Sequence, residues 1–154
     1  MRLDPPTKEQ HLVALALAVD ISRDTCHVAA ARIQTVIGPA IMHVYAQNPA
    51  TDRQIEFGKT ISIDVSRDSN LVASAKISDR LFVINTEAAA KLSLKPGDSV
   101  RVRESIAHII ATYKFDEEFV VSSVQPNGRV MFKGGCGRGA WAAQLELCNR
   151  QINY

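Results

Sequence analysis

Residues 15–33 read LALAVDISRDTCHVAAARI, and this stretch predicts two helices joined by a turn. The small side chain of Ala16 allows two helices to cross closely, and Asp20 stands where a reversing chain tolerates the left-handed conformation. Ser22 is of a residue type that caps a following helix, whose apolar positions Cys26 and Ile33 would face a core. We therefore expect a helical hairpin in the N-terminal part of the chain.

This register resembles the two-helix core of winged helix-turn-helix regulators, including the GntR type, with no gap across residues 15–33. The resemblance implies a non-enzymatic DNA-binding protein, a transcriptional regulator whose second helix contacts base edges in the major groove. The matching positions at the start of that helix are the expected DNA-binding residues Ser22, Arg23, Thr25 and His27.

A second interpretation of the same helices is a hairpin that docks on a protein partner. Leu17 and Ala18 are apolar where helix-turn-helix proteins expose polar side chains, and Val28 lies on the face that would meet DNA. Residues 1–58 also carry five basic and six acidic side chains, whereas phosphate contacts normally supply much of the affinity for DNA. Both interpretations remain open at the level of the sequence.

The remaining N-terminal residues complete an expected helical domain over residues 1–58. Thr7 and Gln10 form the pattern of a capping box, which predicts a helix from about Lys8 to Val19. Gly38-Pro39 is expected to end the second helix. A short third helix over 41–46 and a polar linker over 48–53 are expected next.

From Lys59 onward the hydrophobic pattern changes to strand periodicity, beginning with the alternation of Ile61, Ile63 and Val65. The expected strands are 61–65, 71–77, 80–84, 99–103, 106–114, 119–124 and 129–133. Short strands at this spacing predict a small β-barrel over 59–154, so the fold class is α+β. Residues 140–152 fit a helix or a strand, and their Ala, Gln, Leu and Glu content favours helix.

Residues 80–103 read RLFVINTEAAAKLSLKPGDSVRVR, which predicts a strand, a short helix, a turn and a second strand. Pro96 stops the helix, Gly97 takes positive φ, and the Asp98 carboxylate bonds its local backbone. These 24 residues resemble the AbrB-type swapped-hairpin module and, more broadly, cradle-loop barrels. The resemblance implies a dimer that binds DNA, although related barrels serve as enzymes or ligand carriers.

A glycine-rich loop, Lys133 to Gly139, is the third candidate site. Its exposed N–H groups, followed by a helix N-terminus, would suit a phosphate or carboxylate. The expected anion-binding residues are Lys133, Gly135, Gly137, Arg138 and Gly139. A plain flexible loop is the alternative interpretation.

The composition sets limits on the class of protein. The 154 residues carry a net charge of +2, which excludes a strongly basic architectural nucleic-acid binder. Three cysteines without C-x-x-C spacing predict reduced thiols and a cytoplasmic location, and the four histidines lack metal-ligand spacing. No stretch approaches the roughly 20 apolar residues of a membrane span. We expect no membrane association, no cofactor, no metal and no internal repeat.

The sequence therefore predicts a DNA-binding protein, a homodimer, without a catalytic site. The first alternative is an assembly protein that binds a protein partner through its N-terminal helices. The second is a small barrel that binds a nucleotide or another anion, and this alternative leaves an enzymatic activity open.

Overall fold

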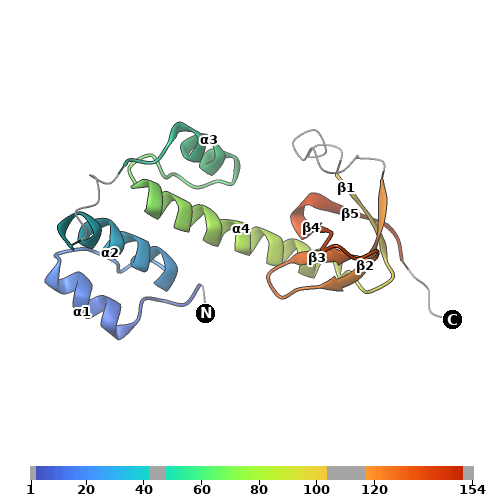
Figure 1. The fold of residues 1–154 in the computed structure, drawn as a ribbon, viewed down its shortest axis with the longest axis horizontal. Helices are drawn as coiled ribbons and strands as arrows, with labels where there is room; N and C mark the ends of the chain where they lie inside the picture. Colours follow the sequence, from blue (N-terminus) through green and yellow to red (C-terminus); the bar gives the residue numbers. More distant parts are fainter. Residues whose placement is uncertain (1–2, 42–47, 104–116, 151–154) are drawn as a thin grey trace. The chain divides into compact units, whose positions relative to one another are not determined.

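The computed structural model describes residues 3–41, 48–103 and 117–150, and its elements make an α+β protein (Figure 1). Helices α1 (Lys8–Ala16), α2 (Cys26–Ile41), α3 (Asp52–Thr60) and α4 (Asn70–Leu92) come first. Strands β1 (Ser99–Val102), β2 (Glu118–Val124), β3 (Arg129–Phe132), β4 (Gly139–Trp141) and β5 (Leu145–Asn149) follow, with a 3₁₀ turn at Ala142–Gln144. The chain divides into two compact units, residues 1–81 and 82–154.

The N-terminal unit contains an internal repeat, so the expectation that the chain lacks one is wrong. Residues 7–33, TKEQHLVALALAVDISRDTCHVAAARI, align without a gap with residues 51–77, TDRQIEFGKTISIDVSRDSNLVASAKI. Each copy consists of a short helix, a turn and the first part of a longer helix. The copies share the Asp-x-Ser-Arg-Asp turn and the Val-Ala-x-Ala step that follows it.

Both copies begin with the same helix cap. The Thr7 hydroxyl accepts from Gln10 N, while the Gln10 side chain accepts from Thr7 N, and Thr51 and Gln54 reproduce both bonds. The capping box at Thr7 is confirmed. The second box begins inside the segment 48–53 expected to be a linker, because Asn48-Pro49 directly before it is typical of a linker.

The turns of the two copies also match bond for bond. Each has one non-glycine residue in the left-handed region, Ala18 at φ 54° and Ser62 at φ 62°. In each, an aspartate carboxylate accepts from the backbone two residues later at 2.9 Å, Asp20 from Ser22 and Asp64 from Ser66. The left-handed residue is thus Ala18, and the expectation for Asp20 is wrong: its carboxylate organises the turn through this bond instead.

A half-buried ion pair and a small core complete each copy. Asp24 accepts from Arg32 at 2.7 Å in the first copy, and Asp68 accepts from Lys76 at 2.8 Å in the second. The first core contains Ala14, Ile21 and Ala29, and the second contains Ala50, Val65 and Ala73. Ala16, the expected helix-crossing residue, is exposed, and Ala14 is the buried alanine of α1.

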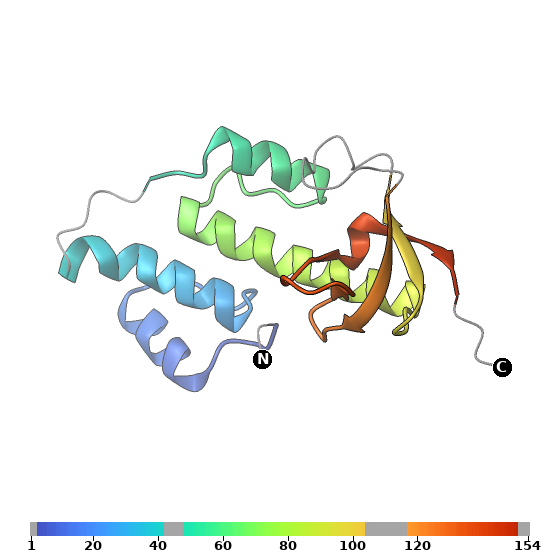
Figure 2. The ribbon, with the colours of Figure 1, turned by 45° about the vertical axis from the view of Figure 1, so that its right-hand side comes forward.

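The two copies pair through α2 and α4, which run antiparallel (Figure 2). The Thr25 hydroxyl donates to Asp79 at 2.5 Å, and the Thr35 and Ser69 hydroxyls lie 2.9 Å apart. Thr25 is equivalent to Ser69 and Thr35 to Asp79, so the two contacts are reciprocal. The apolar cluster between them, Val28, Ala31, Val72 and Ala75, consists of two equivalent pairs. An approximate two-fold axis therefore passes between α2 and α4.

The C-terminal unit is built on a five-stranded antiparallel sheet in the order β4-β3-β2-β1-β5. The expected barrel is wrong, because the sheet is not closed. One face buries a cluster that includes Val100, Val121, Val130 and Leu145. Ala88 and Ala89 of α4 pack on this cluster, which explains why a small-residue run stands at this place in the sequence.

Three of the expected strands, 99–103, 119–124 and 129–133, are confirmed to within a residue of their ends. The expected strands at 71–77 and 80–84 are helix α4, and 61–65 is the turn before it. The expected strand at 106–114 lies outside the described residues, and so does the expected helix at 41–46 apart from Ile41, the last residue of α2.

Two further differences concern α2 and the end of the chain. Helix α2 continues to Ile41, past Gly38-Pro39. Residues 140–152 do not form the favoured helix: the described part consists of the end of β4, a 3₁₀ turn and β5, whose Leu145 pairs with Val102 of β1.

The expected domain boundary at residue 58 falls within α3, and the chain divides into its two compact units between residues 81 and 82, within α4.

The expected turn at Pro96-Gly97-Asp98, before β1, is confirmed. Gly97 has φ 95°, and the Asp98 carboxylate accepts from Lys95 N at 2.8 Å. The residues ahead of this turn are helical, so the strand that the AbrB-type module requires there is missing. Over the described part of the chain, none of the helices has the length and apolar character needed to cross a membrane.

We predict that Gly128→Ala destabilises the C-terminal unit by about 2–4 kcal/mol. Gly128 has φ 85°, and a Cβ there would lie 2.5 Å from the backbone oxygen of Asn85. Gly135→Ala is the matched control, because Gly135 has φ 76° but no atom within 4 Å of its Cβ position. Urea unfolding should show a loss of about 1–2 kcal/mol for this control. Equal losses in the two variants would contradict the close approach of Asn85.

Candidate functional site

The two equivalent turns place a serine and an arginine at the surface just before a long helix. Ser22 and Arg23 precede α2, and Ser66 and Arg67 precede α4; all four are exposed. The bond from each aspartate to the following serine N–H fixes the backbone of this segment. The geometry is therefore set by the turn itself and is the same in both copies.

The acidic side chains beside the two arginines are held by local partners. The backbone N–H and hydroxyl of Ser22 lower the pKa of Asp20, and the hydroxyl and backbone N–H of Ser66 lower the pKa of Asp64. Asp24 accepts two hydrogen bonds from Arg32, at 2.7 and 3.0 Å, and this pairing raises the pKa of Arg32. The lowered pKa values favour the ionised forms of Asp20 and Asp64 in the two turns, and Asp24 is engaged in the ion pair.

Arg23 and Arg67 differ from these paired groups. Neither guanidinium hydrogen-bonds to another residue within the ranges that the structure describes, although each lies in the field of the nearby turn aspartate. Thr25, just before α2, bonds Asp79 of α4, and Ser69, just before α4, lies beside Thr35 of α2. The starts of the two helices are therefore ten positions apart along α2. At 1.5 Å per residue this is roughly 15 Å along the helix axis.

The other two expected DNA-binding residues serve the pairing of the copies. Thr25 donates to Asp79 Oδ2, and His27 Nδ1 lies 2.8 Å from Asp79 Oδ1. Asp79 is 7% exposed, so its carboxylate is satisfied inside the unit. The role of Asp79 could not be predicted from the sequence, because its partners lie more than 50 positions away in the chain.

The face of α2 that would enter a DNA groove is covered by α4. Val28 is 4% exposed and packs against Val72 and Ala75, which accounts for an apolar residue at that position. Residues 17–25 separate α1 from α2, whereas helix-turn-helix motifs use a turn of three or four residues. Ser22 does not cap α2; the Thr25 hydroxyl does, accepting from Val28 N at 3.1 Å.

A shallow groove of about 510 Å³ lies on the approximate two-fold axis. Its lining consists of four equivalent pairs, His27 and Leu71, Ala30 and Ser74, Ala31 and Ala75, and Gln34 and Ser78. The His27 side chain, 39% exposed, stands at the groove while its Nδ1 is held by Asp79. The two copies thus present different side chains at the same structural positions.

The glycine-rich loop of the C-terminal unit joins β3 to β4. Four successive residues, Gly134, Gly135, Cys136 and Gly137, have positive φ, and the loop from Lys133 to Arg138 is exposed. A strand follows it, so the expected helix N-terminus is wrong, and the local anion-binding arrangement would consist of backbone N–H groups and side chains alone. Gly139 is buried, and a Cβ there would lie 2.4 Å from the backbone oxygen of Val130.

The two basic residues of this loop have different surroundings. Arg138 lies 3.6 Å from the Glu117 carboxylate, and its guanidinium stands 5.2 Å from the centre of the Phe119 ring. Lys133 is exposed, and its backbone N–H donates to Val120. The loop therefore brings the expected residues together, with Arg138 partly engaged by the sheet.

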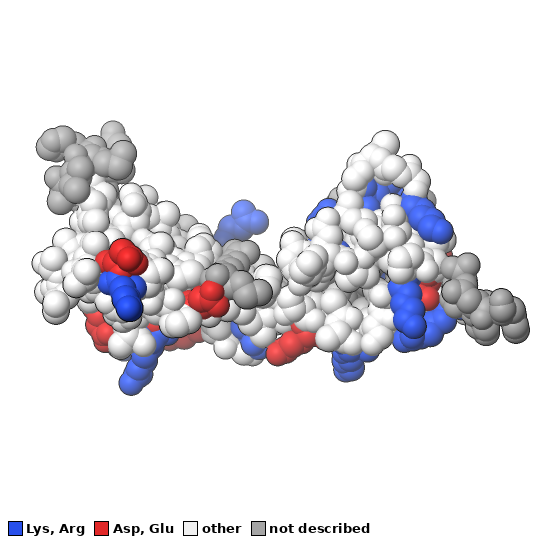
Figure 3. Space-filling view, turned by 90° about the horizontal axis from the view of Figure 1, so that it is seen from below, with Lys and Arg blue, Asp and Glu red and all other residues white. Residues whose placement is uncertain are grey.

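The basic side chains are scattered on the face drawn in Figure 3. Lys and Arg form separate blue areas there, consistent with a net charge of only +2.

Comparison of the chain with protein-family models, with curated proteins and with solved structures finds no match.

We predict that Asp79→Ala lowers the stability of the N-terminal unit by about 1–3 kcal/mol. The change removes the acceptor for both Thr25 and His27 at a buried position. Glu87→Ala, an exposed change on the same helix, should stay within about 0.5 kcal/mol of the wild type. Denaturant unfolding followed by circular dichroism measures both, and similar stabilities would show that Asp79 does not hold the two copies together.

Proposed function

We propose that this chain is a non-enzymatic DNA-binding protein that contacts duplex phosphates through its two equivalent turns. The observation that carries the proposal is the repetition of an exposed arginine, Arg23 and Arg67, in the same structural setting. The turn bonds and the core would serve the fold in either copy. An exposed arginine kept in both copies has no such structural use.

The chemistry of the turns suits a phosphate. A guanidinium binds phosphate oxygens in a bidentate manner, and each arginine stands beside an exposed serine hydroxyl and the start of a helix. The positive end of the helix dipole at the start of α2 and of α4 adds attraction for an anion. Ser22 and Arg23 therefore remain in the proposal, joined by Ser66 and Arg67.

The arrangement of the two turns also suits a duplex. The helix starts are roughly 15 Å apart along α2, which is comparable to the width of a DNA groove, about 12 Å for the major groove. A duplex has local two-fold symmetry between its strands, and the turns are related by an approximate two-fold axis. Equivalent arginines would contact equivalent phosphates on the two sides of one groove.

This mode differs from the one expected from the sequence. Thr25 and His27 are bonded to Asp79, so we assign them to positioning α2 against α4 and not to base contacts. Contacts to phosphates carry little sequence information. We therefore expect binding to many duplexes with strong salt dependence, and a regulatory role would need additional contacts for sequence choice.

The glycine-rich loop is a second contact candidate. Lys133 and Arg138 flank a segment of exposed backbone N–H groups, with Gly135 and Gly137 at its centre. Successive N–H groups in such conformations form concave anion sites. We propose it as an auxiliary phosphate contact of the same DNA-binding function.

The experiment compares duplex binding by the wild type, Arg23→Ala, Arg67→Ala and the double variant at several salt concentrations. Each single change should weaken binding and reduce the slope of log affinity against log salt by about one, and the double change by about two. Both residues are exposed, so melting temperatures should stay unchanged.

Lys59→Ala is the matched control, since Lys59 is an exposed basic residue of the same unit outside the turns. It should leave the slope near the wild-type value. The proposal fails if the wild type shows no salt-dependent binding to duplex DNA, or if the double variant keeps the wild-type slope.

A further inference from the structure

Two leucines of α1 are exposed to an extent that the fold does not require. Leu12 is 69% exposed and Leu15 is 80% exposed. The equivalent positions in the second copy hold Glu56 and Lys59, which are exposed on α3. The same local structure thus forms with charged residues at both places, so leucine is not required there to hold the helix.

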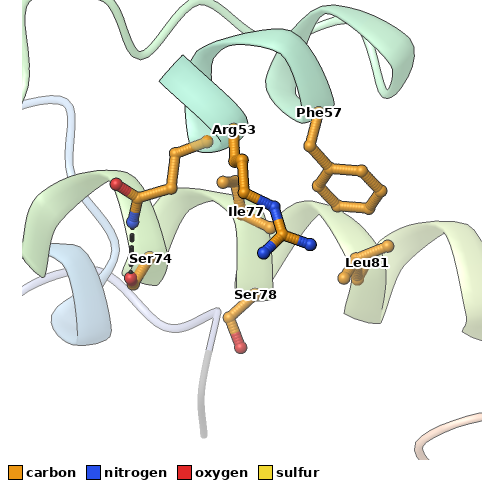
Figure 4. A pocket seen from close by; sticks show the side chains of 7 residues that line it. Arg53, Phe57, Ser74, Ile77, Ser78 and Leu81 are labelled. Atoms are coloured by element: carbon orange, nitrogen blue, oxygen red, sulfur yellow. Dashed lines mark hydrogen bonds between the residues drawn. The ribbon is translucent and has the colours of Figure 1, made fainter. Parts of the chain in front are cut away.

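A groove in the second copy has the complementary character. It lies between α3 and α4, has a volume of about 470 Å³, and has Phe57, Ile77 and Leu81 as its apolar residues (Figure 4). Phe57 is 43% exposed and faces Leu81 across the groove. Gln54 bonds the Ser74 hydroxyl at 2.9 Å and closes one end, and the Arg53 side chain extends into the space between that end and Phe57.

The charges of the helix and the groove match as well. Glu9 of α1 is the equivalent of Arg53, so the charge at this position is reversed between the copies. Glu9, Leu12 and Leu15 are spaced three residues apart, which places them as successive neighbours along one side of the helix. A helix with a carboxylate followed by two leucines fits a groove with a guanidinium beside apolar side chains.

The helix that fills this groove must come from another molecule. The buried face of α1, at Ala14, packs in the first core with Ile21 and Ala29. Helices α1 and α3 lie on opposite sides of the α2–α4 pair in both ribbon views (Figures 1 and 2). The outer row of α1 therefore cannot reach the groove of its own chain while the unit stays folded.

We infer that α1 of a second copy of this chain docks in the α3–α4 groove, with Leu12 and Leu15 on the apolar residues and Glu9 paired with Arg53. This inference goes beyond DNA binding and does not depend on it. Reciprocal docking between two copies closes a dimer, and one-way docking continues from copy to copy. Both forms use the same contact.

The test measures the mass of the full-length protein without DNA, by sedimentation over a range of concentrations. The wild type should self-associate. Leu12→Glu combined with Leu15→Lys installs the residues of the second copy, so the fold is expected to tolerate them. This variant should be monomeric, with the circular dichroism spectrum and melting temperature of the wild type.

A charge exchange tests the groove independently of the leucines. Arg53→Glu and Glu9→Arg should each weaken association about tenfold, and the two changes combined in one chain should restore it. Glu56→Gln is the control, since Glu56 is an exposed acidic residue of α3 that does not line the groove.

A wild type that is monomeric at its highest soluble concentration would overturn the inference, as would association that survives the leucine changes. If the leucine variant proves unfolded, the charge exchange carries the test alone. A combined charge variant that stays dissociated would show that the α3–α4 groove is not the acceptor.

Discussion

The antiparallel packing of α2 against α4 is the contact on which the N-terminal unit depends. Each copy of the repeat has a core of only a few small side chains, and neither core would cover the face that carries Val28 or Val72. Pairing the copies buries these faces against each other and satisfies the hydroxyls and the carboxylate at their edges. The exposed turns, the groove on the axis and the opposite placement of α1 and α3 all follow from this arrangement.

The sequence predicted local structure well where one residue type has one physical use. The capping box at Thr7, the positive φ of Gly97 and strands β1, β2 and β3 are predicted correctly because proline, glycine and cap residues act within a few positions. The short helix expected before the Pro96-Gly97 turn is confirmed as the last part of α4, but residues 71–77 and 80–84 are predicted as strands because their β-branched residues and the alternating Ile61, Ile63 and Val65 ahead of them imitate strand periodicity. The Ala-rich face of α4 and the pairing with α2 decide in favour of helix, and that pairing is a tertiary effect.

The candidate site shows the same limit. Arg23 and Ser22 could be identified from the sequence, since they flank a recognisable turn, but the partners of Thr25 and His27 could not. The repeat was the strongest signal available, because two ungapped copies distinguish what the fold needs from what is left for other uses. Aspartate, serine and the Val-Ala-x-Ala step recur for structural reasons. Leu12 and Leu15 differ from their counterparts, and the structure gives them no internal partner among the described residues that would explain the difference.

The similarity of the two copies allows competing helix pairs while the protein folds, because α2 of one chain could pair with α2 of another chain, and α4 with α4. An α2–α2 pair would oppose Thr25 to Thr35, two hydroxyls with no carboxylate between them, and each His27 would lose its acceptor. Only the mixed pair gives Asp79 both a hydroxyl and an imidazole. Thr35 of the first copy and Asp79 of the second occupy equivalent positions, and this one difference favours the pairing of α2 with α4 over the pairing of two like helices. It also determines which end of the pair carries the histidine.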